Sequence, residues 1–302
     1  MKIKRFAFFI VLLSLLVITV AGCQPRFQPG TYTDDSGRAV SINKIPERIV
    51  SHVPSITETL FALGLEEKVV GVSDYCDYPK EAKSKPSVGS YFNPSIESIV
   101  TLDPDLVLTG GHSESIKQLD DLGITYMVID SKDIDGIFRD IKLLGKVAGI
   151  EGRANRLMND MEKDVSRIVS RVKDAPRVRV FYMFDATDLN NPWTAGPGSF
   201  VDSLIIMAGG ENIAAKAPSA WVQFNIEAVV DANPEIIMID ASMGTAVIAL
   251  AKLREHPVWR RLTAVREGRL YLIDGDLINR PGPRIVRGLE EIARTIHPKL
   301  FE

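Results

Sequence analysis

The sequence predicts an α/β protein of two related lobes, each with a parallel sheet, which one long helix joins. Three observations lead to this prediction. Residues 153–175 contain neither Gly nor Pro, and their apolar side chains recur at gaps of three and four, the period of an amphipathic helix. The stretches before and after this helix repeat each other. In both stretches, short apolar runs alternate with helical patterns, which is typical of α/β folds.

The repeat consists of two pairs of segments that occur in the same order. SIESIVTLDPDLVL (95–108) matches NIEAVVDANPEIIM (225–238), and SITETLFALGL (55–65) matches SFVDSLIIMAG (199–209). Each member of the first pair has an acid at its third place and Asp or Asn before Pro. The copies lie much further apart than the roughly 20–50 residues of a solenoid repeat. The pattern therefore indicates two related lobes.

Local signals predict the elements of each lobe. Asp35-Ser36-Gly37 between strand-like residues predicts a hairpin over 31–45. Gly64 is a helix stop signal, and Asn93-Pro94 is a start signal because Pro suits the first helical turn. Helices are expected at 55–63, from 93 onward and at 283–297, and strands at 48–53, 69–72, 106–108, 126–129, 178–184, 236–239 and 270–273.

The first 22 residues have the pattern of a secretory signal. A basic region (Lys2, Lys4, Arg5) precedes the apolar run 6–17, and small residues precede Cys23 as in a bacterial lipobox. We expect an exported protein that is lipidated at Cys23 and meets the membrane only through this anchor; the alternative is an uncleaved anchor helix. The predicted domains are a signal peptide (1–22), a tether with the hairpin (23–46), an N-terminal lobe (47–150), the interdomain helix (151–175) and a C-terminal lobe (176–302).

Composition narrows the class of protein. The 302 residues are enough for two domains with cores of their own. Without the three basic residues of the signal, the formal net charge falls from −3 to −6. An acidic chain without basic runs argues against nucleic-acid binding. The sequence has two cysteines, so a lipidated Cys23 leaves Cys76 without a disulfide partner, and we expect Cys76 to be a small buried residue.

The sequence carries no catalytic or metal-binding signature. Its histidines (His52, His112, His256, His297) are scattered, with no HExxH pair, and GxGxxG, P-loop and GxSxG motifs are absent. We therefore predict no catalytic residues, no metal site and no cofactor. Residues 110–113, Gly-Gly-His-Ser, faintly resemble an oxyanion loop, so an envelope lipoprotein hydrolase is the alternative from a different class.

Aromatic residues in loops are the stronger functional signal. They lie next to Pro, Gly or polar residues, outside the periodic stretches: Tyr75, Tyr78, Tyr91, Phe92, Trp193 and Trp221. Such side chains offer a large rigid surface to a bulky planar ligand, and they come from both lobes, so a ligand could lie between the lobes. Each could instead pack in a core or loop. Arg280 and Arg284, in a Pro- and Gly-rich segment, could contact polar ligand groups or be solvated.

Glu97 and Glu227 occupy equivalent places in the repeat, each in the first turn of a predicted helix. There a carboxylate favours the positive end of the helix dipole by about 0.3–1 kcal/mol, which is a sufficient structural role. The functional alternative is a partner with two-fold symmetry, because such a partner presents the same basic patch twice.

The residues also resemble a known family. RIVSHVPSITETLFALGLEEKVVGVSDYCDYP (48–79), SIESIVTLDPDLVL, NPWTAGPGSFVDSLIIMAGGENIA (191–214) and HPVWRRLTAVREGRLYLID (256–274) resemble substrate-binding proteins of ABC importers for vitamin B12, iron siderophores and haem. The resemblance covers about residues 30–300. The DYCDYP loop and the NPWTAG turn are most similar to the vitamin B12-binding members.

This resemblance implies a class III periplasmic binding protein, with Rossmann-like lobes and a rigid connecting helix. It implies docking of Glu97 and Glu227 on arginines of a dimeric permease, and a monomeric binding protein. It implies contacts with a corrinoid, cobalamin, from these residues: Tyr75, Tyr91, Phe92, Trp193, Trp221, Asp276 and Arg280. Tyr91 and Leu277 stand where the resemblance predicts Trp, which favours an iron siderophore or a corrin precursor as the alternative ligand. Delivery of haem is a further alternative of the same class.

Overall fold

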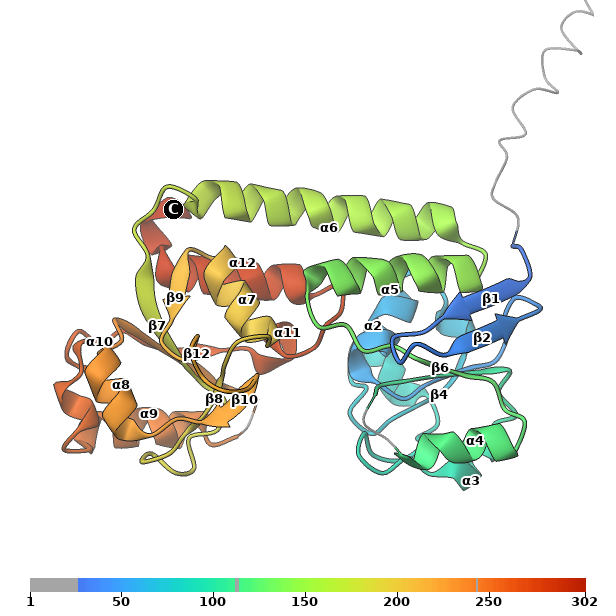
Figure 1. Cartoon of the computed structure of the whole chain (residues 1–302), viewed down its shortest axis with the longest axis horizontal. Coiled ribbons are helices and arrows are strands. Elements are labelled where there is room, and N and C mark those ends of the chain that lie inside the picture. The colour runs from blue at the N-terminus through green and yellow to red at the C-terminus, as the bar shows by residue number, and fades with distance from the viewer. Residues whose placement is uncertain (1–26, 112–113, 243) are drawn as a thin grey trace, which may run out of the picture.

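The computed structural model describes residues 27–111, 114–242 and 244–302. Two α/β lobes lie side by side beneath one long helix, α6 (Glu151–Val172), as Figure 1 shows. The predicted fold class is confirmed. The signal peptide and Cys23 lie outside the described residues, as do His112 and Ser113 of the 110–113 stretch. The limits drawn for the domains at 46, 150 and 175 stay predictions.

The N-terminal lobe is built on a four-stranded sheet in the order β4-β3-β5-β6, with all its strand pairs parallel. Every residue of β5 is buried, as expected for a strand covered on both faces. A separate antiparallel hairpin precedes the sheet, as predicted. The elements are β1 (Gly30–Thr33), β2 (Ala39–Ile42), β3 (Ile49–Ser51), α2 (Pro54–Ala62), β4 (Val69–Val72), α3 (Ile96–Thr101), β5 (Leu106–Thr109), α4 (Gln118–Asp121), β6 (Tyr126–Val128) and α5 (Ile134–Val147).

The C-terminal lobe has a second four-stranded parallel sheet, in the order β12-β11-β7-β9. All of β11 is buried. Two short strands, β8 and β10, form an antiparallel ribbon of their own. The elements are β7 (Val178–Met183), β8 (Trp193–Ala195), α7 (Phe200–Met207), β9 (Gly210–Asn212), β10 (Trp221–Gln223), α8 (Ile226–Ala232), β11 (Ile236–Asp240), α9 (Ala246–Glu255), α10 (Thr263–Arg266), β12 (Leu270–Ile273), α11 (Gly275–Ile278) and α12 (Ile285–Ile296).

The sequence repeat is also a repeat of backbone conformation. Helices α3 and α8 start in the same way, with the side chains of Ser95 and Asn225 each accepting a hydrogen bond from the backbone N–H three residues on. After these helices, Asp103 (φ 45°) and Asn233 (φ 42°) both adopt the left-handed conformation. Asp and Asn tolerate this conformation better than most residues. The shared residue types of the repeat therefore serve the same local geometry in both lobes.

The connecting helix α6 starts at Glu151, two residues before the periodic stretch 153–175, and ends three residues before the end of that stretch. Its buried residues, Ala154, Met161, Ile168 and Val172, recur at the helical period. It packs against α5 of the N-terminal lobe and α12 of the C-terminal lobe. Figure 1 shows these two helices directly beneath α6, so a single helix packs against both lobes.

Two predicted helix starts are displaced. Helix α3 begins at Ile96 instead of Asn93, because Ser95 caps it and Pro94 precedes the cap. Helix α12 begins at Ile285 instead of Pro283 and ends at Ile296. The strands β8, β9 and β10 were not predicted, because three residues are too few to show a period.

Candidate functional site

A cleft of about 930 Å³ lies between the two lobes. Segments that follow β3, β5 and β6 line it from the N-terminal lobe, and Phe184 after β7 lines it from the C-terminal lobe. These segments all lie at the carboxyl ends of parallel strands, where α/β folds place their ligands. The loop after β4 contributes Tyr75.

Aromatic side chains from both lobes face this cleft. The N-terminal lobe contributes Tyr75, Tyr91 and Phe92, and the C-terminal lobe contributes Phe184, Phe200 and Trp221. Phe92 is 78% exposed, Tyr75 52% and Trp221 40%. Exposed large apolar side chains that gather in a hollow are typical of a binding site.

Tyr91 is held in place by a buried histidine. The rings of His52 and Tyr91 are stacked, with centroids 6.0 Å apart and planes 7° apart. His52 Nε2 lies 3.0 Å from the carbonyl oxygen of Ser90, and its Nδ1 lies 3.3 Å from Thr109 Oγ1. Burial lowers the pKa of His52, which favours the neutral ring. The phenol of Tyr91 is thus presented to the cleft on a fixed support.

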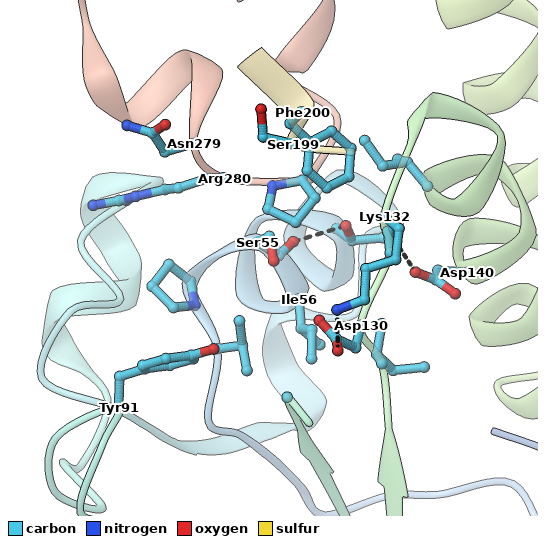
Figure 2. Close-up of a pocket in the computed structure, with 18 of the residues that line it drawn as sticks. Ser55, Ile56, Tyr91, Asp130, Lys132, Asp140, Ser199, Phe200, Asn279 and Arg280 are labelled. Atoms are coloured by element: carbon cyan, nitrogen blue, oxygen red, sulfur yellow. Dashed lines mark hydrogen bonds and ion pairs between the residues drawn. The ribbon is translucent and has the colours of Figure 1, made fainter. Parts of the chain in front are cut away.

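Two helices, one from each lobe, begin at the cleft. Pro54, Ser55 and Ile56 open α2 there, and Ser199 and Phe200 open α7 (Figure 2). The Ser199 hydroxyl accepts a hydrogen bond from the N–H of Asp202 and donates one to the carbonyl oxygen of Gly196, at 2.8 Å. Ser55 and Ser199 were not predicted as site residues, although they occupy the first place of the second repeat pair.

Asp130, Ser131, Lys132 and Asp140 form a polar wall of the cleft. Figure 2 shows Asp130, Lys132 and Asp140 across the cleft from Tyr91 and Arg280. Lys132 forms an ion pair with Asp130, and the hydroxyl of Ser131 donates a hydrogen bond to Asp140. Asp140 is buried, and this burial, with added repulsion from Asp35, raises its pKa to about 7. No sequence motif predicted this wall, because Asp130, Ser131 and Lys132 follow β6 in an ordinary loop and Asp140 lies further along the chain, on α5.

Arg280 lines the cleft, but three carboxylates surround its guanidinium. Its nitrogens lie 2.6 Å from Asp77, 2.8 Å from Asp276 and 3.5 Å from Glu58. Arg284 adds a bidentate pair with Glu58, at 2.6 and 2.8 Å. Glu58 and Asp77 belong to the N-terminal lobe and the other three residues to the C-terminal lobe. We call this group the interlobe charge cluster.

The structure brings five of the seven predicted ligand contacts to the lining: Tyr75, Tyr91, Phe92, Trp221 and Arg280. It does not bring Trp193 or Asp276 there. Trp193 is on β8, opposite Gln223, two residues further along the ribbon than the position opposite Trp221. Asp276 lies behind Arg280 and pairs with it.

The two acids predicted to dock a partner lie away from the cleft. Glu97 on α3 and Glu227 on α8 are both exposed. Figure 1 shows α3 and α8 on the side of their lobes opposite α6. Both acids lie in the first turn of their helices, so they occupy equivalent positions in the two lobes.

The structure also gives the surroundings of Cys76 and allows a search for metal-binding groups and membrane-spanning helices. Cys76 is buried, its sulfur lies 3.2 Å from the hydroxyls of Thr57 and Ser73, and burial raises the pKa of its thiol. In the described part of the chain, no group of three or more His, Cys, Asp or Glu side chains could hold a metal ion. Within the same residues, no helix is long and apolar enough to cross a membrane.

Comparison with known proteins agrees with this architecture. Residues 49–277 match the family of periplasmic binding proteins. The chain is 34% identical to an uncharacterized ABC transporter substrate-binding lipoprotein, YvrC, of Bacillus subtilis, over 91% of this chain and 87% of that protein. It is 31% identical to a cobalamin-binding protein of Halobacterium salinarum, over 89% of this chain and 74% of the relative.

One solved structure with the same fold is that of a haem-binding protein. The periplasmic haem-binding protein RhuT of Roseiflexus sp. RS-1, in its apo form, superposes with a TM-score of 0.76 at 27% identity. The match covers 84% of this chain and 99% of RhuT. The resemblance inferred from sequence is therefore confirmed: the chain belongs to the periplasmic binding protein family, as a substrate-binding protein of an ABC importer and not an enzyme.

Proposed function

We propose that the protein captures a corrinoid, cobalamin, in the interlobe cleft and delivers it to an ABC importer. The observation that carries this proposal is the cleft of about 930 Å³ with aromatic side chains on both sides. A volume near the upper end of the range for small-molecule sites suits a large ligand, and opposed rings suit one with flat faces. The cobalamin-binding relative at 31% identity supports the same ligand class.

Haem is the second candidate, because the haem-binding protein RhuT shares the fold at 27% identity. A ferric siderophore is the third, from the sequence resemblance. The experiment is titration of purified protein with cyanocobalamin, haem and a ferric siderophore in turn, with bound ligand measured by absorbance after gel filtration. We expect cyanocobalamin to co-elute with the protein. Co-elution of haem or the siderophore alone would replace the corrinoid assignment.

Delivery requires a surface for the permease, and Glu97 and Glu227 are the residues we assign to it. Each has an exposed valine one helical turn later, Val100 (42% exposed) and Val230 (40% exposed). The two lobes thus offer the same pairing of an acid with an apolar side chain. A dimeric permease with arginines at its docking surface fits this arrangement, because it can engage both lobes alike.

Charge reversal tests this docking role. In cells that carry the cognate permease, we expect Glu97→Lys with Glu227→Lys to abolish corrinoid uptake while soluble affinity stays unchanged. Glu162→Lys, at an exposed position on α6, is the matched control. Normal uptake by the double variant would leave helix capping as the role of the two acids.

The lipid anchor at Cys23 is tested separately. Cys23→Ser should yield a precursor that no longer partitions with the detergent phase of a membrane extract. Partitioning like that of the wild type would show that the lipobox interpretation is wrong.

A further inference from the structure

The cations that face the cleft are already paired. Among the lining residues that the structure describes, Lys132 and Arg280 are the positively charged ones. Lys132 is ion-paired with Asp130. Arg280 has contacts with Asp77, Asp276 and Glu58. Neither cation is therefore left to neutralise a negative charge on a ligand.

The surroundings of both cations are more negative than positive. The interlobe charge cluster holds two guanidinium groups against three carboxylates. On the opposite wall, Asp130 and Asp140 face the cleft beside a single lysine, and Asp35 lies behind Asp140. Asp140 titrates near pH 7, so the wall gains another negative charge above that pH. A carboxylate brought into this cleft meets an unfavourable potential on two sides.

The remaining electropositive groups of the cleft are helix N-termini and hydroxyls. They carry only partial charges, and their N–H and O–H bonds point in definite directions. The helices α2 and α7 begin at the cleft, and a helix N-terminus carries a partial charge of roughly half a unit. At α7 the N-terminus is already satisfied in part by Ser199 and by Asp202 in its first turn. Backbone N–H groups and the hydroxyl of Ser55 suit a neutral carbonyl oxygen, whereas the Ser199 hydroxyl already donates to Gly196. The carboxylates of the wall suit an N–H donor.

We infer that the cleft selects ligands whose peripheral groups are uncharged amides over ligands that carry free carboxylates. A primary amide offers a carbonyl acceptor and two N–H donors, so it can match both kinds of lining group. A carboxylate offers acceptors only and adds a charge that no free cation of the described lining balances. This inference rests on the proposed capture of a large corrinoid-like ligand. It concerns how the cleft distinguishes that ligand from analogues that carry free carboxylates.

The experiment compares cyanocobalamin with its monocarboxylic acids, in which one peripheral amide is hydrolysed. The two share size, corrin ring and metal, so only one charge and one pair of N–H donors differ. At pH 8 and low salt we expect the acids to bind about 5- to 30-fold more weakly, measured by quenching of tryptophan fluorescence. High salt should reduce this ratio, because it screens charge.

A variant shows whether the wall causes the discrimination. Asp130→Asn removes one carboxylate and releases Lys132, so the ratio between amide and acid should fall below about threefold. Asp135→Asn, on an exposed position of α5 outside the lining, should leave the ratio unchanged. Equal affinity of the wild type for amide and acid would overturn the inference while leaving corrinoid capture standing. If neither corrinoid binds, the proposed function fails and the inference fails with it.

Discussion

The boundary between the lobes contains two buried carboxyl groups with opposite surroundings. Glu58 is 3% exposed and is held by the guanidinium groups of Arg280 and Arg284. Asp140 is 5% exposed, accepts a hydrogen bond from Ser131 and lies beside a second carboxylate, Asp35. Burial raises the pKa of Asp140 to about 7. Glu58 thus belongs to the part of the boundary where ion pairs join the lobes, whereas Asp140 lines the part that forms the open cleft.

The joining part is held by ion pairs across the lobes, whereas the open part is lined by partly exposed aromatic rings. Arg284 also lies over the ring of Tyr78, 3.9 Å from its centroid, so this ring covers one side of the cluster. In the cleft, by contrast, Phe92 leaves most of its surface exposed. The comparison predicts that changes in the cluster alter stability and that changes in the cleft alter ligand affinity.

The largest effect is expected at Glu58. Glu58→Ala removes a buried carboxylate and leaves two partly buried guanidinium groups without their shared partner, and breaking a buried pair destabilises a protein by about 3–5 kcal/mol. Urea unfolding of the ligand-free protein measures the loss. The control is Glu67→Ala, an exposed acid on the same side of the lobe. A difference below about 1 kcal/mol between the two variants would show that the cluster does not hold the lobes.

The second effect is a pH dependence that comes from Asp140. Its pKa rises from 3.8 to about 7 on folding, so the folded state holds the proton more tightly. Its contribution to stability is therefore full below pH 4 and is lost as the pH rises through 7, by roughly 2–4 kcal/mol.

Asp140→Asn cannot titrate and keeps an acceptor for Ser131, so its stability should vary less between pH 4 and 8 than that of the wild type. Urea unfolding across this range measures the change. Asp160→Asn, on the exposed face of α6, is the control and should follow the wild type. A wild-type curve that is flat over the same interval would contradict the shifted pKa.

The third effect separates the two tryptophans. Trp221→Ala should weaken corrinoid binding roughly 5- to 150-fold, because a stacked ring contributes about 1–3 kcal/mol. The melting temperature of the ligand-free protein should stay near wild type, since Trp221 is partly exposed. Trp193→Ala serves as the matched comparison and should change affinity less than about threefold, because Trp193 is outside the lining. Equal losses for both would mean that the site extends further along the ribbon.

The smallest effect concerns the ring beneath Arg284. Tyr78→Leu removes the cation–π contact and should lower the free energy of unfolding by about 0.5–1 kcal/mol. Tyr78→Phe keeps the ring and should lie near the wild type. Chemical denaturation of both variants measures their stabilities. Equal stability of the Leu and Phe variants would show that the cation–π contact does not stabilise the cluster.

Much of the fold was readable from the sequence, because its signals are local. The helical period marks α6, and the apolar runs mark both parallel sheets. The repeat predicted two equivalent lobes, since Asp103 and Asn233 serve the same left-handed turn. Helix starts were less certain, because Ser95 and Asn93 are both good caps and only the fold selects between them.

The sequence by itself determined which residue types the cleft would use: aromatic side chains in loops on both sides of a connecting helix. The tertiary structure alone decided which of them meet. Trp193 and Trp221 have similar local settings, and the pairing of β8 with β10 brings only Trp221 to the lining. Arg280 faces the cleft as predicted, but its charge is matched by Asp77, 203 residues away in the chain. Ion pairs over such separations leave no local pattern, because they form only in the folded tertiary structure, where segments far apart in the chain meet.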